Sequence, residues 1–339
     1  MTEPARPPRP PRPPRSRAEA RLVQRPSPAV IARRRLVVGG GAVLGLGALG
    51  YGVSELVGGD AATSAAPSPR ATGSSATGSA TPTASPAASP SPSPSTPTAA
   101  AVVEAPRLTA RLEDYLDERR GTLGLQLVDL DRNQVFRFRA EPGLCYSTIK
   151  VLILTTVLRL GQEDGKQLSE RQRGLAERMI TRSDNAATET LLAQVGRPEV
   201  ERVAGLVGMK ETEIDTGWWG HWRTVPGDLD TMVSAVLSSD AVLDGARRAT
   251  ARFMMADVVD EQRWGVFAPE GDDVYVAGKN GWGPMPDGYH LNTTGWVVGE
   301  GREYVLGVLS TSPRGFRYGR ETISSVARLC HDALGEELA

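Results

Sequence analysis

An apolar run at residues 148–160 constrains the fold of this chain more than any other feature. Its aliphatic side chains point all the way round a helix: Ile149, Val151, Leu152, Ile153, Leu154, Val157, Leu158 and Leu160. A helix that is apolar on every side must be buried on every side. The preceding Glu141-Pro142-Gly143 is typical of a turn. The sequence therefore predicts a central helix that begins near Ser147 and against which other elements pack.

Lys150 lies inside this apolar helix, where an ammonium group is costly unless it is paired or has lost its proton. Ser147 stands three residues earlier on the same face, at the helix N-terminus. Free backbone N–H groups at that end can hold an oxyanion, and a lysine of lowered pKa can activate a serine nucleophile. The alternative is a helix-capping serine and a lysine that extends toward solvent. The pair alone leaves both interpretations open.

The first 35 residues are rich in proline and arginine and differ in charge from the rest. They contain ten Arg against Glu3 and Glu19, a surplus of +8, so the remainder carries about -9 of the net charge of -1. Because this tail has no apolar periodicity, we expect residues 1–35 to be disordered. The mildly acidic body argues against nucleic-acid binding.

Residues 36–56 are predicted to be an export signal or a membrane anchor. Arg33-Arg34-Arg35 precedes a Gly-rich apolar stretch that ends near Val53, and small residues at 61–66 could hold a cleavage site. The twin arginines and weak hydrophobicity resemble a twin-arginine export signal. If uncleaved, the segment would anchor the chain in the cell membrane with its arginines in the cytoplasm. In both cases we expect the remainder to be extracytoplasmic.

Residues 57–105 consist largely of Ala, Ser, Pro and Thr and predict a linker. At about 3.1 Å per residue, the stretch from residue 61 to about residue 101 could reach ~120 Å, which suits a domain held away from a membrane. The expected folded domain is 106–339.

Cysteine and histidine usage predicts no metal site and no cofactor. Cys145 and Cys330 lie in the exported part, where a disulfide between them is possible. The histidines, at His221, His290 and His331, are scattered and have no metal-ligand spacing.

The folded part reads as helix, two strands, a block of helices, three strands and a final helix. Strands are expected at 122–131, 134–139, 273–279, 292–299 and 303–311, and helices at 107–120, 169–182, 185–195, 198–207, 228–237, 245–258 and 321–334. This order predicts an α+β fold, in which a five-stranded antiparallel sheet with flanking helices carries an inserted all-α lobe.

Two further polar motifs stand at the ends of predicted elements. Ser183-Asp184-Asn185 separates two helices and is also typical of a helix N-cap. Lys279-Asn280-Gly281 ends a strand, and Gly281 allows a ligand to approach the backbone closely.

Taken together and in this order, the three motifs resemble those of the serine β-lactamase and penicillin-binding superfamily. The order of elements is most similar to that of class A β-lactamases, from about residue 106 to the C-terminus. The resemblance implies the β-lactamase/transpeptidase-like fold.

The resemblance also implies a catalytic set. Ser147 would be the acylated nucleophile, and Lys150 would be its base or proton relay. Ser183 would pass the proton to the leaving nitrogen. Lys279 would hold the carboxylate side of the substrate electrostatically.

For substrate binding, the resemblance implies that Asn185 binds the acyl amide, with Asn280, Gly281 and Trp282 on the returning strand. The oxyanion would lie between the N–H of the nucleophile and a strand N–H near Trp282 or Gly283. Two positions depart from the family pattern. Asn280 replaces a usual Thr or Ser, and Trp282 stands where a hydroxyl residue often helps to bind a carboxylate.

A third departure concerns the acidic residue that class A enzymes use for deacylation. The loop at 215–226 lacks their Glu-x-x-Leu-Asn pattern, and Glu211 and Glu213 come too early. Slow deacylation is therefore expected. The loop and neighbouring segments hold most of the tryptophans, which either wall a pocket for a sugar or bulky acyl amide or pack under short loops: Trp218, Trp219, Trp222, Trp264 and Trp282.

The sequence thus predicts an exported serine acyl hydrolase that forms an acyl-serine with a β-lactam or a related cell-wall amide. Its expected partner is a small-molecule β-lactam or a peptidoglycan stem peptide. The alternatives are a D-Ala-D-Ala-type peptidase, a non-catalytic peptidoglycan-binding pseudo-enzyme, and a Ser-His-Asp hydrolase that uses His221.

Overall fold

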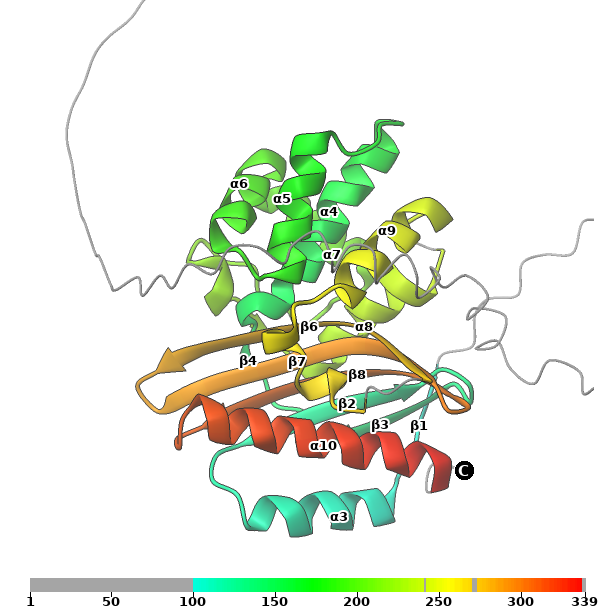
Figure 1. Cartoon of the computed structure of the whole chain (residues 1–339), viewed down its shortest axis with the longest axis vertical. Coiled ribbons are helices and arrows are strands. Elements are labelled where there is room, and N and C mark those ends of the chain that lie inside the picture. Colours follow the sequence, from blue (N-terminus) through cyan, green and yellow to red (C-terminus); the bar gives the residue numbers. More distant parts are fainter. Residues whose placement is uncertain (1–99, 241, 270–272, 337–339) are drawn as a thin grey trace, which may run out of the picture. The chain divides into compact units, whose positions relative to one another are not determined.

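The computed structural model describes residues 100–336 of the chain, except residues 241 and 270–272 (Figure 1). The predictions for residues 1–35, 36–56 and most of 57–105 lie outside these residues. Within the described part, no helix is long and apolar enough to cross a bilayer.

A six-stranded sheet runs through the domain in the order β1-β3-β2-β8-β7-β6 (Figure 1). Its strands are β1 (Ala101–Val102), β2 (Leu123–Asp129), β3 (Gln134–Phe138), β6 (Val274–Met285), β7 (Gly288–Gly299) and β8 (Arg302–Ser312). The N-terminal and C-terminal strands meet where β2 pairs antiparallel with β8. The predicted assembly of one sheet from both ends of the domain is therefore confirmed.

The prediction of five strands was wrong by one, because β1 adds a short parallel strand beside β3. The Ala101 N–H donates to the carbonyl of Asn133 at 3.0 Å, and the Val103 N–H donates to that of Val135 at 2.9 Å. A two-residue strand has no alternation that a sequence can display. The end of the segment assigned to the linker thus belongs to the sheet.

The strand predicted at 273–279 is also longer, since β6 pairs with β7 as far as Met285. The sequence did not predict this extension, because its apolar alternation is interrupted by Gly281, Gly283 and Pro284. Proline is tolerated here because β6 is an edge strand, with β7 as its sheet neighbour. The Lys279-Asn280-Gly281 motif therefore lies inside the strand rather than at its end.

The two faces of the sheet bury separate apolar cores. On one face pack α3 (Pro106–Asp117) and α10 (Phe316–Glu336), the latter beginning five residues before the predicted 321–334 (Figure 1). On the other face lies the helical lobe, made of α4 (Lys150–Glu163), α5 (Glu170–Thr181), α6 (Asn185–Val195), α7 (Arg197–Val207), α8 (Pro226–Val233) and α9 (Gly245–Ala256).

Helix α4 is the buried central helix that the sequence predicted. Every residue from Lys150 to Leu158 is buried. Each large aliphatic side chain buried here stabilises the fold by roughly 1.5–3 kcal/mol. Thr155 and Thr156 tolerate burial because their hydroxyls donate to backbone carbonyls one turn earlier, at 2.7 Å and 2.9 Å. The helix starts one turn later than predicted, because Tyr146–Ile149 form the 3₁₀ turn η1.

The possible disulfide between Cys145 and Cys330 is not formed. Both are buried free thiols, and each lies in a different apolar core, on opposite faces of the sheet. Burial raises the pKa of Cys330 to about 12, so this thiol is unreactive near neutral pH.

Candidate active site

The side chain of Lys150 is fully buried, and its ammonium lies among polar acceptors of the neighbouring helix pair. Its Nζ donates to the backbone carbonyl of Ser183 at 2.7 Å, to Ser183 Oγ at 3.2 Å and to Asn185 Oδ1 at 2.7 Å. The first two predicted motifs therefore come together around one amino group. In the described part of the chain, Ser147 Oγ is not hydrogen-bonded to this amine.

Burial lowers the pKa of Lys150 to about 7, against the opposing charges of Asp184 and Glu189. The amine therefore exchanges between its charged and neutral forms near neutral pH. The neutral form is the one that can accept a proton from a hydroxyl.

Ser147 lies in η1, at the point where this turn meets the edge strand β6. A Cβ added to Gly281 would come within 2.7 Å of the Ser147 nitrogen and 3.0 Å of the Cys145 carbonyl. Only glycine at position 281 lets the strand backbone approach the serine so closely. The serine side chain is partly exposed, whereas its neighbours Tyr146 and Thr148 are buried.

This close approach predicts that Gly281→Ala destabilises the domain. An added methyl in a packed contact typically costs about 1–3 kcal/mol, and it would push η1 away from β6. Urea unfolding of the full chain measures the effect. Gly174→Ala is the matched control, because a Cβ there meets nothing within 4 Å. It should be neutral or slightly stabilising, since alanine favours a helix. An equal change in stability for the two substitutions would argue against the close packing of Gly281 on η1.

In the second motif, Asp184 caps a helix, whereas Ser183 has an unusual backbone conformation. Asp184 is the N-cap of α6, accepts the Ala187 N–H at 3.0 Å and pairs with Arg178 at 3.1 Å. Ser183 adopts a left-handed backbone with φ 58. Such a conformation is costly for a non-glycine residue and clusters at functional sites. Tyr146, beside the other serine, has φ 43.

Lys279 is the second fully buried lysine of the site. Its Nζ donates to the carbonyl of Asn280 at 2.8 Å. Burial, and next the nearby charge of Lys150, hold its pKa well below that of free lysine. A carboxylate that entered the site would favour the charged form of Lys279.

The side chains of Asn280 and Trp282 are not directed to this cluster. Asn280 is fully buried and donates to the carbonyls of Gln262 and Trp264, while its Oδ1 accepts from Thr293 at 2.6 Å. The Trp282 ring packs edge-on against Trp264. The backbone carbonyl of Asn280 accepts from Lys279, and Gly281 lies directly against η1.

The loop that would carry a deacylating acid instead places Trp219 at the site. Its ring centroid is 4.7 Å from Lys150 Nζ, and the indole is 3% exposed. Asp215 is exposed and its carboxylate accepts the N–H of Gly217 at 2.7 Å, so it caps its own turn. His221 is exposed and lies edge-on to Tyr146.

Of the other predicted pocket tryptophans, Trp222 and Trp264 are core residues at 0% and 4% exposure. Trp218 is 42% exposed, and its ring packs on Gly220, where a Cβ would clash with it. It lies beside Trp219 with ring centroids 4.7 Å apart, so it presents a fixed aromatic surface near the site.

Asn292 is a buried polar residue beside the turn of Ser147 that the sequence did not indicate. It is the cross-strand partner of Gly281, and its amide donates to the Cys145 carbonyl at 3.1 Å. Because Gly281 has no side chain, this amide reaches the turn that carries Ser147. Its neighbours Thr293 and Thr294 are also fully buried, and such a polar run within a core strand is a usable signal.

Among the described residues, no three His, Cys, Asp or Glu side chains gather in an arrangement that could hold a metal ion. The site consists of amine, hydroxyl and amide groups. Such a set suits acyl transfer to serine.

A sequence model of the Beta-lactamase enzyme family matches residues 171–334. This match includes Ser183, Asn185 and Lys279 and begins after Ser147 and Lys150. No curated protein matches the chain.

Solved structures with the same fold include PBP-A, at 22% identity and a TM-score of 0.61, covering 68% of this chain and 97% of PBP-A. A class A β-lactamase from Bacteroides cellulosilyticus aligns at 16% identity and a TM-score of 0.60, covering 68% and 98%. A mutant of PBP-A, solved as an acyl-enzyme complex with penicillin G, aligns at 21% identity and a TM-score of 0.60, covering 68% and 97%. At these identities the likeness is one of fold, and it confirms the predicted β-lactamase/transpeptidase-like architecture.

Proposed function

We propose that this chain, whose fold and family match are those of the class A β-lactamase-like superfamily, is an exported serine acyl hydrolase. It would form an acyl-serine at Ser147 with a β-lactam or a related cell-wall amide. The observation that carries the proposal is the buried amine of Lys150. This lysine lies one turn after Ser147, and its amine donates hydrogen bonds to both Ser183 and Asn185.

In the acylation step, neutral Lys150 accepts the hydroxyl proton of Ser147, and Oγ bonds to the substrate carbonyl carbon. The carbonyl electrons move to oxygen, and the Ser147 N–H with a β6 N–H near Trp282 or Gly283 would hold that oxyanion. The close packing of Gly281 on Ser147 supports this arrangement. When the oxyanion collapses, the amide C–N bond breaks and Ser183 passes a proton to the leaving nitrogen.

Two further groups would orient the substrate. Asn185 uses its Oδ1 on Lys150, which leaves its NH₂ group for the carbonyl of an acyl amide. Lys279 would attract the substrate carboxylate. The hydroxyl that the family pattern usually offers beside this lysine is replaced by Asn280, whose side chain is engaged elsewhere. Carboxylate recognition would therefore depend mainly on Lys279.

We expect the acylation rate to depend on the ionisation of Lys150. Since the base is the neutral amine and its pKa is about 7, the rate should rise with pH and level off above neutrality. Below pH 7 it should fall about tenfold for each pH unit. Rapid-quench labelling with a penicillin from pH 5 to pH 9 measures this profile.

His221→Ala is the control for that profile, because His221 is the base of the alternative Ser-His-Asp mechanism. It should leave both rate and profile unchanged, whereas Lys150→Ala should lower the rate by about 10²–10⁴-fold. A rate that rises only near pH 10, or one lost in the histidine variant alone, would argue against Lys150 as the base.

A D-Ala-D-Ala-type peptidase remains the nearest alternative. The indole of Trp219 at the place expected for a deacylating acid supports it, because a β-lactam would then behave as a slowly released inhibitor. Release of D-alanine from a stem peptide tests this. A pseudo-enzyme that only binds peptidoglycan would give neither D-alanine nor a β-lactam adduct.

Export is proposed from residues 33–53, where three arginines precede the weakly apolar run. Protease accessibility of the domain on intact cells, with the full chain expressed, would test this localisation. Substituting Arg33 and Arg34 by Lys should retain the protein in the cytoplasm if the signal is of the twin-arginine type.

A further inference from the structure

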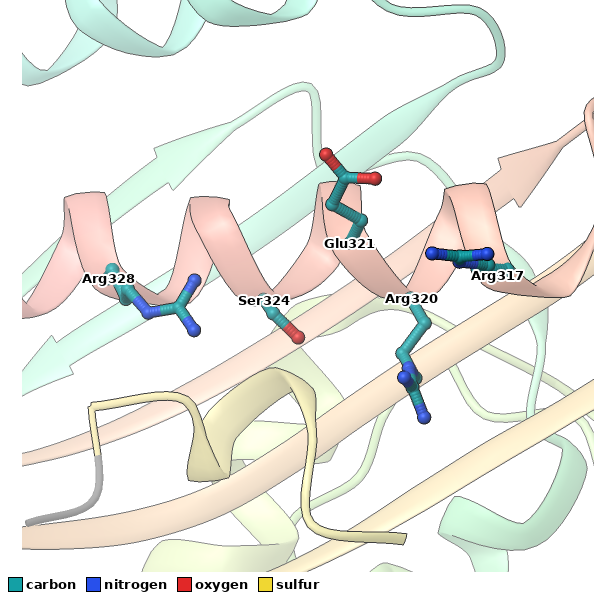
Figure 2. Close-up of a pocket in the computed structure, with 5 residues that line it drawn as sticks. All are labelled: Arg317, Arg320, Glu321, Ser324 and Arg328. Carbon is teal, nitrogen blue, oxygen red and sulfur yellow. The ribbon is translucent and has the colours of Figure 1, made fainter. Parts of the chain in front are cut away.

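A hollow of about 350 Å³ lies along α10, on the opposite face of the sheet from the helical lobe (Figure 2). Its lining residues all come from this helix: Arg317, Arg320, Glu321, Ser324 and Arg328. Arg320 and Ser324 project from the same side of α10, and the guanidinium of Arg328 extends toward Ser324. None of these residues takes part in the proposed chemistry.

The spacing of the side chains creates the hollow. Arg320 lies four residues before Ser324 and Arg328 four residues after it, so the three share one helix face. A short serine between two long side chains leaves space above it. Ser324 is 9% exposed, and its hydroxyl accepts the Gly265 N–H at 3.0 Å, which fixes the floor of the hollow.

The charges around the hollow are unbalanced. Arg317, Arg320 and Arg328 are exposed, and no acidic partner lies within ion-pair distance of them in the described part of the chain. Glu321, an acid that lines the hollow, pairs with Arg119 at 3.7 Å. Arg317 and Arg320, three residues apart on the helix, repel one another, and an anion bound between them would relieve this repulsion.

The chemistry of the guanidinium group indicates the kind of anion. Its planar fork binds phosphate oxygens in pairs, which is why clustered arginines recognise phosphate groups. Arg317 and Arg328 are eleven residues apart, or ~16 Å along the helix. One phosphate group is too small to contact both ends of this row. We therefore propose that the arginine hollow of α10 binds a linear polymer with successive phosphate groups, of the polyphosphate type.

The position of the hollow leaves the candidate active site free. The residues on either side of Ser147, Cys145 and Ile149, lie in the core on the helical-lobe face, whereas α10 packs on the other face (Figure 1). A bound polymer would thus hold the domain in place without covering the serine. The proposal does not depend on the catalytic function.

The test measures binding of long-chain linear polyphosphate to the full chain as a function of salt. The site variant carries Arg320→Gln with Arg328→Gln. The control carries Arg171→Gln with Arg173→Gln, two exposed arginines on α5. We expect the site variant to bind about tenfold more weakly, and its plot of log K against log salt to be less steep by about two. The control should match the unmodified chain.

The arginine-rich tail of residues 1–35 contributes equally to all three proteins, so only their differences matter. Equal weakening in the site variant and the control would overturn the proposal, because it would show a general charge effect. Unchanged polyphosphate binding in the site variant would also overturn it, and loss of binding to vesicles of phosphatidylglycerol would then make this face a membrane contact. Thermal unfolding at the same midpoint in all three proteins verifies that the fold is intact.

Discussion

Ser147→Ala should abolish covalent labelling of the chain by a fluorescent penicillin. Ser147 is partly exposed, its backbone nitrogen lies close to Gly281 of β6, and a buried lysine follows three residues later. Alanine removes the atom that would bond to the carbonyl and leaves the turn unchanged. Labelling followed by gel fluorescence should fall to background.

Ser183→Ala is the matched control for that substitution. Lys150 would keep the Ser183 carbonyl and Asn185 Oδ1 as acceptors, so the site should remain assembled. Labelling should become slower by about 10²–10⁴-fold, because the leaving nitrogen loses its proton donor, but it should reach completion. A label that persists in Ser147→Ala would show that Ser147 is not the nucleophile, and a label that Ser183→Ala alone removes would indicate Ser183 instead.

The second large effect concerns the lifetime of the adduct. Hydrolysis of an acyl-serine needs a base that holds a water on the open face of the ester. The indole of Trp219, against Lys150, cannot take a proton, and Asp215 is exposed and bonded to its own turn. Loss of one positioned base costs about 10²–10⁴-fold, so turnover should lie well below the ~10 s⁻¹ of an ordinary enzyme. The adduct should persist for minutes or longer.

Stopped-flow hydrolysis of a chromogenic cephalosporin, with parallel mass sampling, measures that lifetime. Asp215→Asn and His221→Ala serve as controls and should leave the release rate unchanged. Turnover of tens per second without an accumulating adduct would contradict the account. If one of the controls then abolished release, that residue would be the deacylating base.

The sequence predicted the fold because its long-range pattern was unambiguous. The apolar run of α4 is buried on every side, and β7 and β8 are almost continuously buried along their length. It did not predict β1, which is two residues long and is held by backbone bonds to β3. Nor did it predict the end of β6, where glycines pack against η1 and their role depends on a neighbour distant in sequence.

The grouping of Lys150 with Ser183 and Asn185 was predictable from motif order and family resemblance. The direction of side chains was not. Asn280 follows Lys279 directly, but alternation along the strand turns its amide toward the loop at 262–264. Likewise, the sequence of the loop at 215–226 did not show that Trp219 would lie against Lys150 while Trp218 remained exposed.

Acylation of Ser147 can be measured by the intact mass of the full chain with and without a β-lactam, followed by peptide mapping. We expect a gain of one drug mass per chain, which persists for minutes and maps to Ser147. No mass gain, or an adduct on a peptide without Ser147, would contradict it.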